Sequence, residues 1–150
     1  MTIRESAGGS IDAPAPTVFE FLTDLSRLPD WNRAITEVVE TPTRLAPGTI
    51  WKVRIHALGQ SWVSKSQVSE LDPDARRFAY RSQSDDGNPS FADWAWQVDP
   101  DGDGSMVSVT VDLEPRTFWR KHLLVKVRRP ALRNEMRDSL EALRTAIHAT

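Results

Sequence analysis

Aromatic side chains recur at alternate positions in several segments of the sequence. Phe78 and Tyr80 are two residues apart, as are Trp94 and Trp96, and Trp51 begins a further alternating segment. Side chains two residues apart in a β-strand lie on the same face, so each pair would present its rings together. The indole N–H and the phenol hydroxyl can also orient a polar atom, so such a wall suits an apolar or aromatic ligand. The alternative is that these rings simply fill a hydrophobic core.

Few residues offer acid–base or nucleophilic chemistry. The sequence has three histidines that are far apart from one another, namely His56, His122 and His148. No Ser, His and Asp arrangement is evident in the spacing. Tyr80 is the stronger candidate for a catalytic group, because an inward hydroxyl could reach a carbonyl or enolate oxygen. Asp93 and Asp112 are predicted to face outward; turned inward, either would have a raised pKa and become a candidate base.

Metal and cofactor sites have little support. The sequence contains no cysteine, which excludes metal sites and nucleophiles built on thiolates. Residues 99–104 read Asp-Pro-Asp-Gly-Asp-Gly, like the first half of a calcium-binding loop. The twelfth position of that loop requires a bidentate Glu, and here it is Thr110. We therefore expect a hairpin turn at this place, no metal, and no cofactor, since nucleotide-binding glycine motifs are also absent.

The composition is that of a globular domain. The 150 residues include 19 Lys and Arg against 21 Asp and Glu, and 39% of the residues are apolar. This length suits a sizeable core, so we expect a single domain over residues 1–150. The net charge of −2 gives no general support for nucleic-acid binding. No stretch of about 18 apolar residues and no signal peptide is apparent, so we expect a cytoplasmic protein.

Charge is distributed unevenly along the second half of the chain. Residues 82–115 contain eight acidic residues and no Lys or Arg, whereas residues 116–137 contain eight basic residues and one acidic residue, Glu135. A basic amphipathic helix could contact an anionic membrane or nucleic acid. The alternative, which we favour, is a solvated helix face partly neutralised by the acidic strands. We therefore expect no nucleic-acid partner and no membrane contact.

Two short helices are predicted near the start of the chain. Within residues 11–25, four apolar residues have helical spacing: Val18, Phe21, Leu22 and Leu25. Pro14 and Pro16 are tolerated in the first turn of a helix. Pro29 then prevents simple continuation of this helix, and Trp31 would anchor a second short helix.

An antiparallel sheet is predicted for the middle of the chain. From Ile35 to Leu113 the apolar period changes to two, and turn sequences recur at short intervals. The clearest strand is Met106 to Leu113, whose inward face would consist of Val107, Val109, Val111 and Leu113. The segment Trp62 to Val68 alternates poorly, so its inward face is left open.

A long helix is predicted at the C-terminus. Its apolar stripe consists of Leu132, Met136, Leu140, Leu143 and Ile147. Leu123 and Val127 extend this pattern back to about Phe118. Pro130 should then kink or divide the helix, because proline lacks the N–H group and clashes with the preceding turn.

The motifs near the N-terminus resemble a known signature. Residues 11–32 read IDAPAPTVFEFLTDLSRLPDWN, with an I-x-A-P entry to a helix, an apolar V-F-x-F-L run and an L-P-x-W-N element. This segment resembles the opening signature of the START-like (SRPBCC) superfamily, in the branch labelled polyketide cyclase/dehydrase. The matching positions are Ile11, Ala13, Pro14, Val18, Phe19, Phe21, Leu22, Leu28, Pro29, Trp31 and Asn32. Residues 70–80 and 104–115 resemble the family's Asp-Pro turn and its last strand.

The resemblance implies a helix-grip fold of the α+β class. In this fold a curved antiparallel β-sheet wraps around a long C-terminal α-helix, with two short helices after the first strand and a cavity between sheet and helix. Members of the family bind hydrophobic or amphipathic small molecules, and some cyclise or dehydrate them. The matching positions are structural residues, so the resemblance implies a cavity and no particular reaction.

These features predict a protein that encloses a hydrophobic or aromatic ligand of polyketide or lipid type. The predicted ligand-binding residues, with Trp31 at the entrance, are Trp31, Trp51, Tyr80, Trp94, Trp96, Met136 and Leu140. One alternative is a polyketide cyclase/dehydratase-type enzyme in which the cavity positions the substrate and Tyr80 takes part. Another is an interaction or membrane-transfer module that uses the basic helix. Both ligand hypotheses require a cavity of about 300 Å³ or more. The sequence does not indicate the oligomeric state.

Overall fold

The computed structural model describes residues 2–57, 59–87, 89–114 and 125–149, with the backbone alone at residues 57 and 125–131. The strands are β1 (Ile3–Ile11), β2 (Ile35–Glu40), β3 (Ile50–Ala57), β4 (Gln60–Asp72), β5 (Arg77–Ser84), β6 (Phe91–Asp101) and β7 (Gly104–Glu114). The helices are α1 (Ala15–Thr23), α2 (Leu28–Trp31) and α3 (Val125–His148), with a short 3₁₀-helix (Leu25–Arg27) between α1 and α2.

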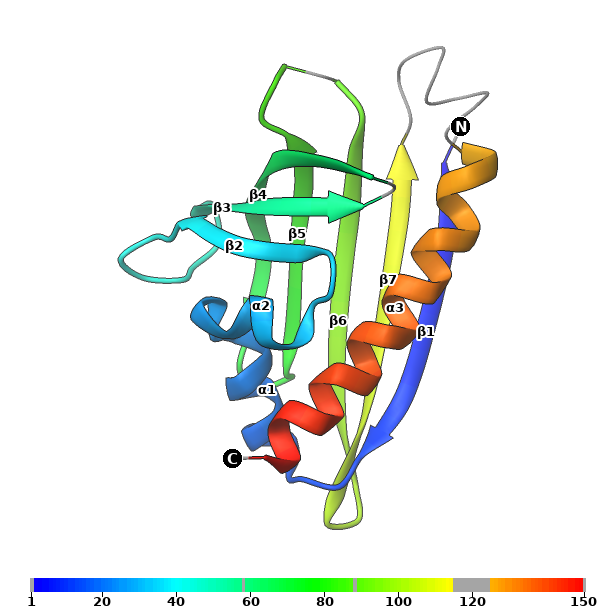
Figure 1. Ribbon diagram of the computed structural model, residues 1–150. Helices are drawn as coiled ribbons and strands as arrows, with labels where there is room; N and C mark the ends of the chain where they lie inside the picture. Colours follow the sequence, from blue (N-terminus) through cyan, green and yellow to red (C-terminus); the bar gives the residue numbers. More distant parts are fainter. Residues whose placement is uncertain (1, 58, 88, 115–124, 150) are drawn as a thin grey trace.

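The strands form one curved sheet, and the helices lie on one side of it (Figure 1). Their order is β1, β7, β6, β5, β4, β3, β2, and every neighbouring pair is antiparallel. α3 packs along β1, α1 packs on β6 and β7, and α2 lies between α3 and β2. The predicted α+β class and helix-grip arrangement are confirmed.

The inward face of β7 supplies the centre of the core. Three fully buried valines alternate along it, namely Val107, Val109 and Val111. Burial of each contributes roughly 1.5–3 kcal/mol of stabilisation. Leu113, at the end of the same face, is only partly buried. β6 and β7 join at a tight turn in which Gly102 has a φ of 60°, so the segment that resembles half a calcium loop is the predicted hairpin turn.

α1 and α2 form where the apolar spacing predicts them. Pro14 immediately precedes α1, and Pro16 lies in its first turn, where backbone N–H groups have no partners within the helix. The buried residues of the two helices are Ala15, Val18, Phe19, Phe21, Leu22, Leu28 and Trp31. α1 packs against β6 and β7, so these helices cover one end of the sheet.

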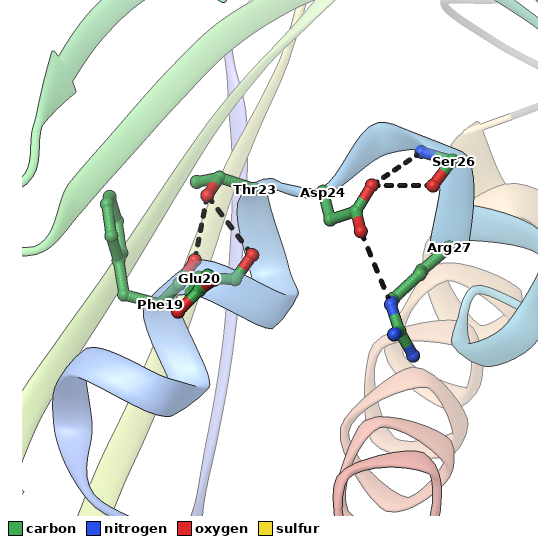
Figure 2. Close-up of polar contacts among 6 residues, drawn as sticks. All are labelled: Phe19, Glu20, Thr23, Asp24, Ser26 and Arg27. Carbon is green, nitrogen blue, oxygen red and sulfur yellow. Dashed lines mark hydrogen bonds and ion pairs between the residues drawn. The ribbon is translucent and has the colours of Figure 1, made fainter. Parts of the chain in front are cut away.

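Asp24 turns the chain from α1 into the next helical turn (Figure 2). Its Oδ1 accepts hydrogen bonds from the backbone N–H of Ser26 at 3.2 Å and from the Ser26 hydroxyl at 2.6 Å. Its Oδ2 accepts from Nε of Arg27 at 3.3 Å. On the other side, the Thr23 hydroxyl donates to the carbonyl oxygen of Phe19 at 2.9 Å. Side-chain hydrogen bonds therefore satisfy polar groups where the helical hydrogen-bond pattern is interrupted.

α3 is anchored to the edge strand β1. Arg133 Nε donates to the buried carboxylate of Glu5 at 2.8 Å, and Arg144 Nε donates to the carbonyl oxygen of Ser10 at 2.9 Å. The hydrogen bond with Glu5 raises the pKa of Arg133 above its usual value. Gly9 allows the close approach, because a Cβ at this position would lie 3.3 Å from the guanidinium group of Arg144.

The predicted apolar stripe of α3 is buried over its whole length, at Leu132, Met136, Leu140, Leu143 and Ile147. The expected division at Pro130 does not occur, since α3 is continuous from Val125 to His148. The N–H group that Pro130 lacks costs one backbone hydrogen bond, and the described helix continues on both sides of it. The predicted start near Phe118, and Leu123 with it, lie outside the described residues.

The acidic residues of segment 82–115 pair with other parts of the sheet. Three ion pairs show this: Arg4 with Asp112 at 2.7 Å, Arg81 with Asp93 at 2.8 Å, and Lys52 with Asp85 at 2.9 Å. Arg133 of α3 instead pairs with Glu5 of β1. Most basic side chains of segment 116–137 lie outside the described residues, so neutralisation of this helix by the acidic strands stays a prediction.

Asp24→Ala should lower the free energy of unfolding by about 0.5–1 kcal/mol at neutral pH, the cost of losing a partly exposed capping side chain. Hydrogen bonds from Ser26 hold the pKa of Asp24 below its usual value of 3.8. Because the folded state favours the ionised form, this contribution is present above the unfolded-state pKa and is lost as the pH falls through the folded-state pKa. Urea unfolding at a series of pH values measures both effects.

Asp24→Asn is the matched control, because the amide oxygen retains an acceptor but does not ionise. The advantage of the wild type over Asp24→Asn should disappear as the pH falls below about 4. An advantage that persists unchanged into that range would contradict the assignment of the carboxylate as the acceptor.

Candidate functional site

The described residues enclose a cavity between the sheet and the helices. It is bounded by β3, β4 and β5, by adjoining ends of β6 and β7, by α2 and by the part of α3 near Leu132. Its aromatic wall consists of Trp51, Trp62, Tyr80, Phe91 and Trp94. Aliphatic and polar residues complete it, including Leu28, Asn32, Ile55, Ser64, Ser66, Ser82, Leu113 and Leu132. The cavity is partly open to solvent, so a ligand has a route of entry.

The cavity is smaller than the sequence-based expectation. The centre of a water molecule can occupy a volume of about 240 Å³, below the lower end of small-molecule sites at about 300 Å³. The volume required of both ligand hypotheses is therefore not reached, which leaves room only for a ligand smaller than a drug-sized molecule. The space therefore suits a compact ligand better than a long acyl chain or a polycyclic compound.

The aromatic wall is held together by ring contacts. The Trp51 and Tyr80 rings meet edge to face, with centroids 4.7 Å apart and planes at 71°. Tyr80 and Trp94 are stacked at 6.3 Å and 17°, and Trp51 stacks on Phe78 at 5.8 Å. Such contacts contribute beyond the burial of apolar area. Three of the five aromatic residues of the wall, namely Trp51, Tyr80 and Trp94, are thus supported by neighbouring rings.

Three of the seven predicted ligand-binding residues lie on the cavity wall, namely Trp51, Tyr80 and Trp94. Trp96, Met136 and Leu140 instead belong to the buried core. Trp96 is two residues further along β6 than Trp94, towards the end that α1 covers. Met136 and Leu140 lie beyond Leu132 on α3, whereas the cavity is at the other end of the stripe. Periodicity identifies which face of a strand or helix points inward, but it does not show which part of that face lines the cavity.

Trp31 lies in the core and not at the entrance. Its side chain is 2% exposed, and its ring meets that of Trp96 edge to face at 5.5 Å and 87°. Leu28 and Asn32, one helical turn apart, line the cavity in its place. Within the described part of the chain, Nε1 of Trp31 is a buried side-chain atom without a hydrogen-bond partner.

The inward face of β4 was not identified from the sequence, and it lines the cavity. Trp62, Ser64 and Ser66 lie on this wall. Two of the three are serines, so the strand lacks the apolar alternation that marks an inward face. The turn at Gly59 is the signal that would have located them. In the hairpin that this turn forms, the β4 residues pair with inward residues of β3, namely Trp62 with Ile55, Ser64 with Val53 and Ser66 with Trp51. Residues that pair directly across two antiparallel strands lie on the same face of the sheet.

Two indole N–H groups donate to hydroxyl groups on the wall. Trp96 Nε1 donates to Oη of Tyr80 at 3.1 Å, and Trp94 Nε1 donates to Oγ of Ser82 at 3.1 Å. Burial raises the pKa of Tyr80 to about 12, although the bond from Trp96 acts in the opposite direction. The Tyr80 hydroxyl therefore stays protonated at neutral pH, where it can donate a hydrogen bond but cannot serve as a base.

The other candidates for acid–base chemistry lie away from the cavity. His56 is exposed, with Nδ1 2.9 Å from the Ser61 hydroxyl, and His148 is exposed at the end of α3. Asp93 and Asp112 face outward in their ion pairs, as predicted. The inward orientation that would make either a base is not found. His122 lies outside the described residues.

The described residues include no group of three or more His, Cys, Asp or Glu that could hold a metal ion. In the same part of the chain, no helix is both long enough and apolar enough to span a membrane.

A family model described as polyketide cyclase / dehydrase and lipid transport matches residues 3–148. The chain belongs to this family. The START-like resemblance of residues 11–32 is thereby confirmed. A comparison with curated proteins gives no match.

Solved structures similar to this member of the polyketide cyclase/dehydrase family share its fold over almost the entire chain. An aromatase/cyclase, Zhui, from Streptomyces sp. R1128 has a TM-score of 0.80 and 17% identity, with 99% of this chain and 94% of that chain covered. A protein from Thermus thermophilus has a TM-score of 0.79 and 21% identity, with 98% of both chains covered. A START superfamily protein from Mycobacterium smegmatis has a TM-score of 0.72 and 17% identity, with 99% and 97% covered. At these identities the similarity shows the fold alone.

Tyr80 should ionise only at strongly alkaline pH in the folded protein. It is the one tyrosine in the sequence, so the ultraviolet absorbance of tyrosinate reports this group alone. The midpoint should lie near pH 12 in the folded protein, against about 10 in concentrated urea. Because the pKa of Tyr80 is higher in the folded state, this group stabilises the fold fully at pH values below its unfolded-state pKa. The contribution is lost as the pH rises through its folded-state pKa.

Circular dichroism at each pH identifies the range in which the protein remains folded. A midpoint near pH 10 with the circular dichroism spectrum unchanged would contradict the burial of the Tyr80 hydroxyl.

Proposed function

We propose that the protein binds a compact, hydrophobic and largely aromatic small molecule in the cavity between its sheet and α3. The observation that carries this proposal is the wall itself, in which five aromatic residues surround a space that remains open. Aromatic walls with a few placed polar groups are typical of small-molecule sites. Membership of a family named for polyketide cyclisation and lipid transport supports a hydrophobic ligand.

The charge of the wall argues against an anionic ligand. The described residues that line the cavity include no Lys, Arg or His, and its charged residues are Glu114 and Glu135. The carboxylate of a bound fatty acid would need a counter-charge or several hydrogen-bond donors from the wall. The described wall thus favours an uncharged ring compound over a free fatty acid.

A polyketide cyclase/dehydratase-type enzyme is the second candidate, favoured by the position of Tyr80. Its protonated hydroxyl could donate to a ketone oxygen and stabilise the charge that develops there as an enolate forms, while a base from the solvent takes the proton from the neighbouring carbon. Holding reacting atoms close together could contribute roughly 7–11 kcal/mol in favourable cases. The structural similarity to an aromatase/cyclase is in accord with this candidate. The interaction or membrane-transfer alternative depends on the side chains of residues 116–131, which are not among the described side chains.

A substitution that fills the cavity should abolish binding. Ala92 and Ala95 both lie on β6, but Ala92 lines the cavity and Ala95 is exposed on the other face of the sheet. With tetralin as the probe, Ala92→Leu should weaken binding roughly 5- to 150-fold, because overpacking costs roughly 1–3 kcal/mol. Ala95→Leu should leave binding unchanged. Nuclear magnetic resonance titrations measure both dissociation constants.

Equal weakening by the two substitutions would place binding outside the cavity, and no binding of tetralin to the wild type at its solubility limit would count against a compact aromatic ligand.

The enzymatic candidate predicts that the protein accelerates enolisation of a bound ketone. In deuterium oxide, the protein should speed deuterium incorporation at the carbon beside the carbonyl group of α-tetralone. Tyr80→Phe should remove the acceleration, because the hydrogen bond to the enolate oxygen is lost. Nuclear magnetic resonance measures the exchange rate. Exchange at the buffer rate while the ketone is bound would favour the binding protein.

A further inference from the structure

A patch of hydroxyl groups interrupts the apolar wall of the cavity. It consists of Ser64 and Ser66 on β4 and of Tyr80 and Ser82 on β5, all of which line the cavity. We call these four residues the hydroxyl patch. Ser66 pairs directly with Ser82 across the two antiparallel strands. Such partners have Cβ atoms roughly 4.5–5.5 Å apart on one face, so one ligand atom can reach hydroxyl groups from both strands.

Two members of the hydroxyl patch have their hydrogen-bonding direction set by tryptophan. Tyr80 accepts from Nε1 of Trp96, and Ser82 accepts from Nε1 of Trp94. An indole N–H can only donate, so each hydroxyl group keeps its own proton for another acceptor. No described residue accepts either proton. Tyr80 and Ser82 thus present donors to the cavity.

The two serines of β4 add hydroxyl groups that are available to a ligand. Ser64 is 4% exposed and Ser66 is 3% exposed. Within the described part of the chain, neither hydroxyl group has a hydrogen-bond partner. Both hydroxyl groups can be reached from the cavity, because Nε1 of Trp31 is the one fully buried side-chain atom without a partner among the described residues. These groups face the space that the proposed ligand occupies.

We infer that the hydroxyl patch is a subsite for a carbonyl-type oxygen, and that Trp94 and Trp96 are positioning residues that hold Ser82 and Tyr80 as donors. The ligand is then a compact ring compound with an acceptor oxygen on the side that faces β4 and β5. This inference rests on the proposed function and narrows it. A plain hydrocarbon of the same shape fills the cavity but leaves the hydroxyl patch unbonded.

The test compares α-tetralone with tetralin, which share a two-ring skeleton and differ in the ketone oxygen. The indole N–H resonances of the six tryptophans provide the signals for nuclear magnetic resonance titrations. The wild type should bind the ketone about tenfold more tightly than the hydrocarbon, as one good hydrogen bond allows. Tyr80→Phe should bring the two affinities close together and leave that of tetralin unchanged. Ser66→Ala is a second variant with the same expected direction.

Trp96→Phe tests the positioning role. It keeps the Tyr80 hydroxyl group but frees it to accept, so the preference for α-tetralone over tetralin should fall while α-naphthol, a donor, binds more tightly. Because tetralin measures packing in every variant, a merely structural loss lowers both affinities and leaves their ratio unchanged. Ala95→Leu, on the outer face, should leave all three affinities as in the wild type.

Equal binding of α-tetralone and tetralin by the wild type would overturn this inference and leave the proposed function standing. Binding of neither compound would overturn both. A Tyr80→Phe variant that loses affinity for both compounds to the same extent would show that Tyr80 only packs against the ligand. An unchanged ratio in Trp96→Phe would remove the positioning role of that residue.

Discussion

Arg133 and Arg144 tie α3 to the edge strand β1, and the position of the cavity follows from this anchoring. Arg133 reaches the buried Glu5, Arg144 reaches the backbone of Ser10, and Gly9 leaves room for the helix to approach. A helix held at this edge packs along β1, while α1 packs on β6 and β7 and α2 packs on β2. The inward faces of β3, β4 and β5 retain uncovered area, and the cavity lies there.

The residues on the inward face of the sheet differ between the part that the helices cover and the part that lines the cavity. Under the helices, β7 presents Val107, Val109 and Val111, which pack tightly and carry no polar atoms. At the cavity, β4 and β5 present serines and Tyr80 beside tryptophan rings. Hydroxyl groups would destabilise a closed core unless they were bonded, so their presence on an inward face is consistent with a site that receives a polar atom. The same sheet thus combines a stabilising core and a binding wall.

The fold was largely predictable because it depends on periodicity. The alternation of residues 106–113 and the helical stripe from Leu132 to Ile147 each identified an element and its buried face. The candidate site was predictable only in part. Trp51, Tyr80 and Trp94 line the cavity, but Trp31, Trp96, Met136 and Leu140 lie in the core, because periodicity does not show where along an element the cover ends. Ser64 and Ser66 were not identified because apolar alternation cannot mark serines. Pro130 was expected to kink or divide the helix, and α3 is not divided there.

The location of a bound probe tests the central claim most directly. Isotope-filtered nuclear Overhauser measurements on the protein with α-tetralone detect the side chains within a short distance of the ligand. The account predicts contacts with Trp62, Tyr80 and Trp94, from three different strands that meet at the cavity. Contacts confined to Ala95 and Thr110, on the outer face of the sheet, would contradict it.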